Sequence, residues 1–335
     1  MKAWLRTLRP DPYIIAILLM VVVASVLPVH GQGAVWFGWL TKAAIALLFF
    51  LHGARLPREA VVAGLVHWRL HLAVLGSTFV LFPLLGLGII QLPTSVLPTQ
   101  LAAGVLYLCL LPSTVQSSIA FTSQARGNVA AAVVAASTSN LIGVVLTPVL
   151  VGLFLHTQTG GLSLKAVQDV AVQILLPFAV GQVARPFVGG WVARHAKLVS
   201  YTDRGSILLV VYGAFSAAVV GGLWKQVSGR ELAVLLVICV LLLAVVLTAT
   251  LMLARALKFS TEDEIVTVFC GSKKGLATGV PMASILFPAA SVGFIVLPVM
   301  LFHQIQLMAC AVIAQRYAAR TAPLVLDQGE GPVGR

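Results

Sequence analysis

Two adjacent lysines lie inside a long apolar stretch toward the carboxyl end of the chain. Residues 268–283 read VFCGSKKGLATGVPMA, in which glycines and a proline surround Lys273 and Lys274. An ammonium group at the centre of a bilayer costs about 2.5 kcal/mol or more, and such groups usually face the interior of a helix bundle. About ten residues, or roughly 15 Å of helix, separate the lysines from Glu264, so neither reaches water by extending its side chain. Both are therefore functional candidates.

Several roles are open for these lysines. A protonated lysine donates three hydrogen bonds, so it can bind the carbonyl groups of a broken helix and stand in for a bound cation. It can instead bind the anionic group of a substrate, assisted by the positive end of a half-helix near Gly275, or carry a coupling proton. A structural lysine would donate to carbonyls without any part in turnover. Because successive helical residues point about 100° apart, we expect one lysine to face the break.

Apolar runs of about twenty residues recur along the chain and predict an all-α polytopic membrane protein. Most of its 22 lysines and arginines fall between these runs, on one predicted side. The positive-inside rule makes that side cytoplasmic, and both termini lie there. The net charge of +12 is thus an orientation signal in a plasma membrane (a bacterial inner membrane) rather than a nucleic-acid surface. The ten predicted spans are residues 12–29, 34–53, 68–90, 100–122, 128–155, 165–186, 205–224, 231–256, 264–287 and 291–316.

The fourth and ninth predicted spans are each interrupted about ten residues in. The interruptions read CLLPSTVQSSIAF (109–121) and CGSKKGLATGVP (270–281). A broken helix frees backbone groups that need partners, and breaks at matching places in two halves point to a binding site at the membrane midplane. The alternative is that glycine and proline merely permit kinks or close packing here.

The chain divides into two halves of five spans each. Residues 1–160 and 161–320 are predicted to form inverted repeats, because an odd number of spans per half reverses its orientation, and 321–335 to form a flexible tail. The fifth and tenth spans contain the similar stretches LTPVLV (146–151) and VLPVML (296–301). A long basic loop at 185–204 is expected between the halves.

Hydroxyl, amide and basic side chains near the breaks are the candidate substrate- and ion-binding groups. They are Ser113, Thr114, Gln116, Ser117, Ser118, Ser137, Thr138, Ser139, Asn140, Ser272, Lys273, Lys274, Thr278 and His303. All acidic residues are expected in tails, loops or span ends, so a sodium site would use neutral oxygens, with Ser117, Ser118 and Ser272 as its candidates. A proton relay through a carboxylate is excluded on the same ground. His52 and His303 remain as titrating candidates, although a lone histidine in a span is more often packed and hydrogen-bonded.

Enzymatic chemistry is not indicated. The sequence has no HExxH, no GxSxG and no pair of membrane aspartates, so we expect neither an enzyme nor a cofactor, leaving sodium open as a coupling ion. The four cysteines all lie in apolar segments and are expected as buried thiols rather than as disulfides or metal ligands. They are Cys109, Cys239, Cys270 and Cys310.

The chain resembles the bile acid:sodium symporter family, in particular its divergent member 7-like branch. The resemblance is carried by FFLHGARL (49–56), by the Pro112–Ser118 break with ARGNVA (125–130) and TPVL (147–150), and by GSKKGLATGVPMA (271–283). It implies ten helices in two inverted five-helix repeats, arranged as a core domain and a panel domain. It also implies that the fourth and ninth helices cross in the core, that an elevator or rocking motion alternates access, and that sodium drives uptake of an amphipathic or small organic anion.

The ninth-helix motif departs from the family pattern. When the GLA triplet (275–277) is aligned, Val268 stands where the sodium-coupled members have a glutamate that ligates both sodium ions. Ser272 and Lys273 stand at their Gln–Asn pair, which favours Lys273 as the lysine that faces the crossing. The usual two-sodium site is therefore not expected.

The fourth and fifth helices depart as well. Ser117 and Ser118 occupy the place of a Ser–Asn pair that helps bind the first sodium, and Ala132 and Ala136 replace two hydroxyl residues. The nearby stretch STSN (137–140) supplies hydroxyls only after a shift in alignment.

The function predicted from the sequence is secondary transport of an organic anion, bile-acid-like or a small carboxylate, with sodium coupling open. One alternative is a cation-independent or proton-coupled anion transporter in which a core lysine replaces sodium. Another is a non-transporting regulatory membrane protein on the same fold. The expected partners are the anion and membrane lipid, with no nucleic acid.

Overall fold

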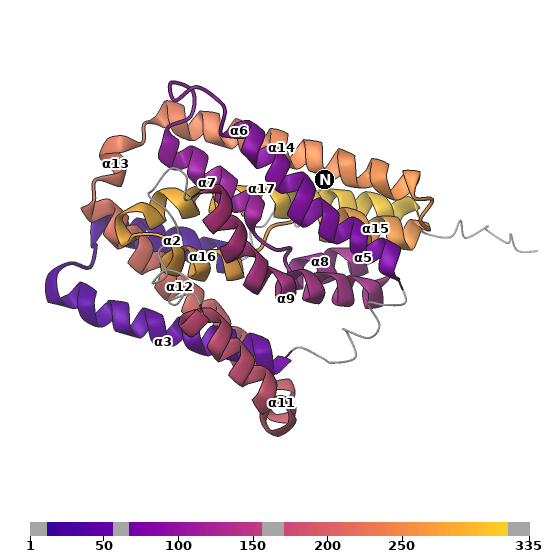
Figure 1. The fold of residues 1–335 in the computed structure, drawn as a ribbon, viewed down its shortest axis with the longest axis horizontal. Helices are drawn as coiled ribbons and strands as arrows, with labels where there is room; N and C mark the ends of the chain where they lie inside the picture. The colour runs from indigo at the N-terminus through magenta and orange to yellow at the C-terminus, as the bar shows by residue number, and fades with distance from the viewer. Residues whose placement is uncertain (1–11, 56–66, 156–170, 321–335) are drawn as a thin grey trace, which may run out of the picture.

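A computed structural model describes residues 12–55, 67–155 and 171–320, and within these ranges the regular structure is helical (Figure 1). The predicted tail at 321–335 lies outside them. The elements, in chain order, are α2 (Pro12–Val26), α3 (Gly31–Arg55), α5 (Trp68–Gly76), η1 (Ser77–Leu81), α6 (Phe82–Ile89), α7 (Thr99–Leu110), α8 (Gln116–Gln124), α9 (Val129–Phe154), η3 (Ala171–Leu175), α11 (Leu176–Arg194), α12 (Ala196–Val220), α13 (Leu223–Gln226), α14 (Gly229–Ala256), α15 (Thr261–Gly271), α16 (Leu276–Leu286) and α17 (Ala289–Arg320).

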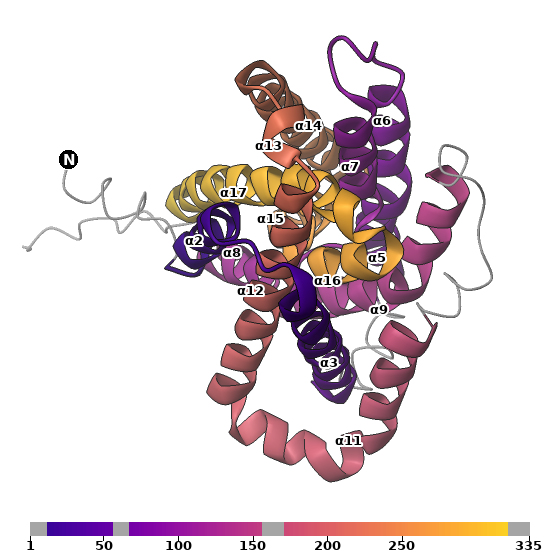
Figure 2. The same ribbon diagram turned by 90° about the vertical axis from the view of Figure 1, so that its left-hand side faces the viewer.

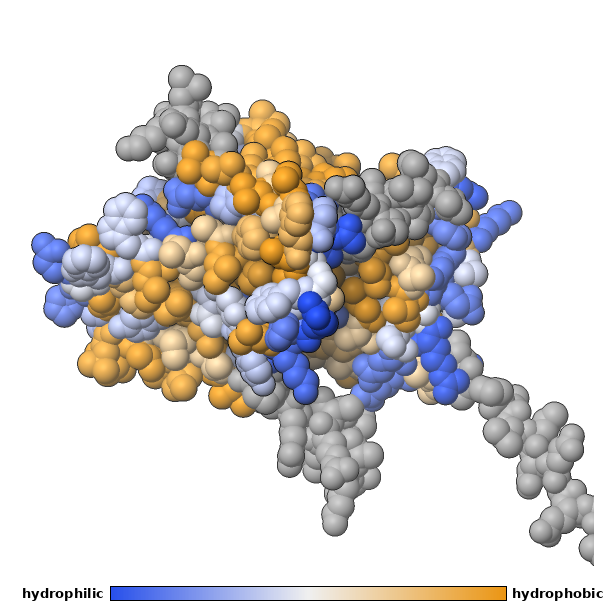
Figure 3. Space-filling model, turned by 90° about the horizontal axis from the view of Figure 1, so that it is seen from below, coloured by the Kyte–Doolittle hydropathy of each residue, from blue (hydrophilic) through white to orange (hydrophobic). Residues whose placement is uncertain are grey.

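The chain is a polytopic membrane protein. In the described ranges, seven helices are long and apolar enough to cross a membrane: Gly31–Arg55, Trp68–Ile89, Val129–Phe154, Val172–Arg194, Ala196–Val220, Gly229–Ala256 and Ala289–Arg320. The other three predicted spans fall on the short helix α2 and on two pairs of half-helices, α7 with α8 and α15 with α16. Figure 3 shows one broadly apolar face, with hydrophilic side chains gathered at its left and right ends and in a group near its centre.

The predicted loop at 185–204 is wrong. Helix α11 continues to Arg194, α12 begins at Ala196, and His195 alone joins them. Arginine and lysine are good helix formers with long apolar stems, so a run rich in them continues a helix as readily as it ends one.

One acidic residue lies deeper than predicted. Asp203 is inside α12 with only 6% of its surface exposed, whereas the sequence placed every carboxylate in a tail, a loop or at a span end. Its partner explains the burial: Arg55 Nη1, at the end of α3, lies 2.6 Å from Asp203 Oδ2. A buried carboxylate is tolerated when a cation pairs with it.

The helices form two groups. Helices α2, α3, α11 and α12 pack together, with α3 between α11 and α12 (Figure 2). The second group contains α5, α6, α7, α8, α9, α14, α15, α16 and α17, and α12 joins the two groups by packing on α16 and α17.

Helices α3 and α11 touch backbone to backbone at two glycines. A Cβ at Gly53 would collide with the carbonyl oxygen of Phe178, and one at Gly181 with that of Phe50. Small residues that permit such contact are typical of helix interfaces in membranes.

We expect Gly53→Ala to lower the melting temperature by about 4 °C or more, because the added methyl group forces α3 away from α11. The control is Gly38→Ala in the same helix, where a Cβ meets nothing within 4 Å. Thermal unfolding of the purified variants in detergent measures the difference. Equal melting temperatures of the Gly53→Ala and Gly38→Ala proteins would contradict the close contact between α3 and α11.

Candidate functional site

Two broken helices meet at their breaks within the second helix group, and we refer to this contact as the crossing. Helix α7 ends at Leu110 and α8 begins at Gln116, whereas α15 ends at Gly271 and α16 begins at Leu276. Both predicted interruptions are thus present. The breaks are bonded to each other: the backbone N–H of Gly275 donates to the carbonyl of Pro112 (2.9 Å), and Ser113 Oγ donates to the carbonyl of Cys270 (2.6 Å).

Lys274 is fully buried and uses all three of its N–H donors on backbone carbonyls. Its Nζ donates to Cys109 (2.8 Å) and Leu111 (2.6 Å) at the end of α7, and to Thr78 (2.8 Å) in η1. The aromatic face of Phe82 lies 4.1 Å from the same nitrogen. The last carbonyls of a helix lack intrahelical partners, so Lys274 supplies donors where α7 needs them.

Lys273 is also fully buried but has a different environment. Its Nζ donates to the carbonyl of Ser117 in the first turn of α8 (3.0 Å). The ring of Phe121 lies 4.0 Å from this nitrogen and that of Phe269 5.1 Å. Aromatic faces attract cations, so two rings and one carbonyl together hold the charge.

The expectation that a single lysine faces the break is wrong. Both lysines reach carbonyls of the α7–α8 break, Lys274 before it and Lys273 after it. The 100° spacing of helical residues does not apply here, because residues 273–275 are not helical. Consecutive residues in a non-helical segment can direct their side chains to opposite sides.

Gln306 of α17 fixes the backbone of the α15–α16 break. Its Oε1 accepts from the backbone N–H of Lys274 (3.0 Å), and its Nε2 donates to the carbonyl of the same residue (2.9 Å). Its Nε2 also lies 2.8 Å from Nδ1 of His303. The sequence analysis missed this residue. A glutamine in the middle of an apolar span was the available signal.

Other candidate residues complete the hydrogen bonding of the breaks. Ser139 Oγ accepts from the backbone N–H of Ser113, and Asn140 Nδ2 donates to the carbonyl of Ser113 (2.6 Å). Thr147, which the sequence analysis did not select, donates to the carbonyl of Leu110 (2.8 Å). Thr138 is half-buried on α9 and does not line the cavity described below.

The hydroxyls selected for sodium already have protein partners. Ser118 Oγ donates to the carbonyl of Phe269 and Ser272 Oγ to that of Val268. Ser117 Oγ is hydrogen-bonded to Thr114 Oγ1 at 2.6 Å. Since the ammonium of Lys273 binds the Ser117 carbonyl, a positive charge already lies beside these residues and disfavours a sodium ion there. Among the described residues, no three His, Cys, Asp or Glu side chains gather to hold a metal.

A cavity of about 690 Å³ lies between the two helix groups, beside the crossing. The first turns of α8 and α16 both line it, and Phe49, His52, Asp203 and Arg204 line the opposite wall. Six candidate residues contribute polar groups to it besides Ser113 and Thr114: Gln116, Ser117, Ser137, Asn140, Thr278 and His303. Neither Lys273 nor Lys274 belongs to the lining.

One cavity hydroxyl has no bonding partner. Thr278, in the first turn of α16, is 4% exposed, and its Oγ1 makes no hydrogen bond within the described part of the protein. Buried hydroxyl groups are normally hydrogen-bonded, so an unpaired one that lines a cavity is a candidate ligand contact.

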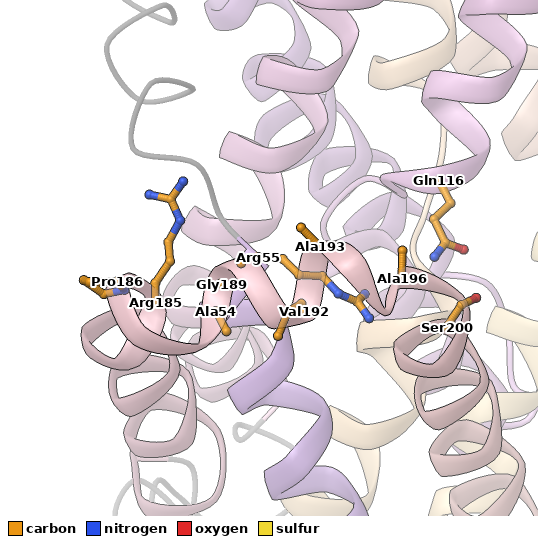
Figure 4. A pocket seen from close by; sticks show the side chains of 11 residues that line it. Ala54, Arg55, Gln116, Arg185, Pro186, Gly189, Val192, Ala193, Ala196 and Ser200 are labelled. Carbon is orange, nitrogen blue, oxygen red and sulfur yellow. The ribbon is translucent and has the colours of Figure 1, made fainter.

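A second cavity, of about 650 Å³, adjoins the first at two shared residues, Arg55 and Gln116. Figure 4 shows the Arg55 side chain extending along α11, with Gln116 reaching toward the same space from α8. Arg185 and Ser200 also line it. Arg55 therefore stands where the two cavities meet.

Comparison with known proteins shows similarity to a transporter family and to proteins of which two are named as a symporter and a cotransporter. The model of the SBF-like CPA transporter family matches residues 11–319. The chain is 55% identical to "Uncharacterized protein PA2026" of Pseudomonas aeruginosa over 96% of its length and 97% of that protein. It is 53% identical to "Putative symporter YfeH" of Escherichia coli over 95% of its length and 96% of that protein. It is 25% identical to "Sodium/bile acid cotransporter 7-B" of Xenopus laevis over 92% of each chain.

We expect Lys274→Met to lower the melting temperature by about 5 °C or more, because it leaves three buried carbonyls without donors. Lys273→Met, which frees one carbonyl, should cause a smaller loss. The control is Lys42→Met, which removes an exposed lysine that lies over Trp39 in α3. Thermal unfolding in detergent gives the melting temperatures of the three variants and therefore their order of stability. A Lys274→Met protein as stable as the Lys42→Met protein contradicts the assigned role.

Proposed function

We propose that this chain, which belongs to the SBF-like CPA transporter family, is a secondary transporter that moves an organic anion across a cell membrane. The observation that carries the proposal is the cavity into which the amino-terminal ends of two half-helices, α8 and α16, both open. The first N–H groups of a helix lack intrahelical partners and carry partial positive charge. Two such ends at one cavity favour an anionic ligand.

Side chains around the cavity support the same ligand class. The hydroxyl of Thr278 is buried without a partner beside the α16 end, and Arg55 and Arg204 lie on the opposite wall. Much of the remaining lining is apolar and comprises Phe49, Val115, Ile119, Leu141, Val144, Ile207 and Leu307. An amphipathic anion, bile-acid-like or a smaller carboxylate, matches a positive end beside an apolar wall. The name of the Xenopus laevis relative, "Sodium/bile acid cotransporter 7-B", agrees with this class.

The position of the cavity between the two helix groups supports a mechanism of alternating access. A movement of α2, α3, α11 and α12 against the other helices would open it to one side of the membrane or the other. In this proposal the ten predicted spans form two inverted five-helix repeats, with both termini cytoplasmic. The two helix breaks, in corresponding spans of the two halves, support that arrangement.

The lysines favour transport without sodium. Lys274 fills a position surrounded by three carbonyl oxygens, and Lys273 binds the carbonyl of Ser117, one of the candidate sodium residues. Two built-in ammonium groups thus provide the positive charge that a bound cation would bring to the breaks. We therefore prefer the alternative in which a core lysine replaces sodium over sodium coupling.

We expect taurocholate or benzoate to raise the melting temperature of the purified protein, and Thr278→Val to weaken that binding about fivefold, since one hydrogen bond contributes about 1 kcal/mol. The matched control is Thr248→Val, an exposed threonine of α14 that bonds only within its own helix. Uptake of the labelled anion into proteoliposomes then tests transport. A protein that neither binds nor moves any anion of such a panel would refute the proposal.

Anion uptake should be the same in sodium, potassium and choline chloride, because the protein's own ammonium groups occupy the breaks. The melting temperature should likewise be unchanged among the three salts. Initial uptake rates in proteoliposomes at equal ionic strength measure this. A stimulation of uptake specific to sodium would contradict transport without sodium.

A further inference from the structure

We infer that Arg55 and Asp203 form a proton-coupling site, at which the substrate anion takes Arg55 from Asp203 and Asp203 then binds a proton. The inference rests on the proposed function and names its coupling ion. It assigns this role to an ion pair that joins two helices of the group opposite the breaks, α3 and α12.

The pair is placed to meet a substrate. Arg55 Nη1 and Asp203 Oδ2 are 2.6 Å apart, and both residues line the 690 Å³ cavity. The Asp203 side chain is 8% exposed and that of Arg55 30% exposed. The second carboxylate oxygen, Asp203 Oδ1, is buried and has no hydrogen-bond partner within the described part of the chain. A site for one proton is thus available on this carboxylate.

Arg55 is the cation best placed to bind the anion. It stands where the two cavities meet, whereas the guanidinium of Arg204 lies over the ring of Tyr13 at 5.2 Å. A guanidinium binds a carboxylate or sulfonate through parallel N–H donors. The anionic group of a substrate therefore competes directly with Asp203 for Arg55.

The competition links the anion to a proton. When the substrate takes Arg55, the buried Asp203 carboxylate loses its counter-charge, which is strongly unfavourable in a site shielded from water. Uptake of one proton by Asp203 Oδ1 removes that charge. One anion and one proton thus bind together without net charge, and release of the anion lets Arg55 return and expel the proton. Each ligand favours binding of the other, which is the requirement for cotransport.

The groups around the pair leave Asp203 as the acidic member of the cavity lining. On α3, Nδ1 of His52 donates to the carbonyl of Leu48 (2.8 Å). Arg204 follows Asp203 on α12, Tyr13 lies on α2, and α8 contributes the uncharged Gln116. His303 on α17 is bonded to Gln306. His52 and His303 are the remaining titratable candidates, so the experiment includes them.

The test measures proton uptake during binding of taurocholate, whose sulfonate stays ionised throughout the range used. The purified protein, in weakly buffered detergent solution with a pH indicator, should take up about one proton per taurocholate bound. Its affinity should fall about tenfold for each unit of pH above neutrality, because binding consumes a proton. In Asp203→Asn, taurocholate should bind without proton uptake and with an affinity independent of pH.

Three further variants test whether Asp203, and not another titratable residue, takes up the proton. Glu262→Gln removes an exposed carboxylate outside the cavity, and it should behave like the unmodified protein. His52→Gln and His303→Gln change residues of the cavity lining, and each should still take up about one proton per taurocholate bound, whatever its affinity. If Asp203→Asn is unstable because Arg55 loses its partner, the double variant Arg55→Gln/Asp203→Asn restores neutrality. That protein should fold, bind taurocholate more weakly and take up no proton.

The outcomes distinguish the two proposals. Taurocholate binding without proton uptake by the unmodified protein, or proton uptake that persists in Asp203→Asn, overturns the coupling site and leaves the anion transporter intact. Loss of proton uptake in a histidine variant alone moves the site to that residue and also overturns it. Failure of every anion of the panel to bind overturns the proposed function, and the coupling site with it.

Discussion

The structure depends on a requirement of the broken helix α7: backbone carbonyls inside an apolar bundle need hydrogen-bond donors. Lys274 meets part of this requirement by donating to Cys109 and Leu111, and it donates at the same time to Thr78 of η1. Around it, Thr147 bonds the carbonyl of Leu110, and the backbone N–H of Gly275 bonds that of Pro112. Because one ammonium group joins α7, η1 and the α15–α16 break, the position of the crossing follows from where that group finds its carbonyls.

A crossing held in this way leaves the two half-helices with different ends. The carbonyl end of α7 is satisfied by protein donors, whereas the amino-terminal ends of α8 and α16 open into the cavity. Partial positive charge therefore faces the cavity while the full positive charges of the lysines remain behind the cavity wall. Gln306 supports this separation by bonding both backbone groups of Lys274, which holds the lysine away from the cavity.

The opposite wall of the cavity carries a neutral ion pair. Arg55 and Asp203 neutralise each other across α3 and α12, and they do so in a helix group whose α3–α11 contact is close at Gly53 and Gly181. Lys274 uses all three of its donors on backbone carbonyls, which is consistent with a fixed structural support. The ion pair keeps one buried oxygen unbonded beside the cavity and suits a group that changes partners. The lysines thus stabilise the breaks in the second helix group, whereas the Arg55–Asp203 pair in the first group responds to the ligand.

The sequence by itself determined the helical class, the approximate positions of the seven long apolar helices and both breaks, because these follow from apolar run length and from local interruptions by proline, glycine and lysine. Its motifs also gave the resemblance to a transporter family. Helical spacing failed for the lysine pair, since residues 273–275 are not helical. Charge alone misplaced the 185–204 segment, which a helix accommodates. Only the tertiary structure brought Asp203 to Arg55, 148 residues away in sequence, and Gln306 to Lys274. Such pairs are decided by packing, because a polar side chain is buried only where a distant segment supplies its partner, and no local pattern records which segment that is.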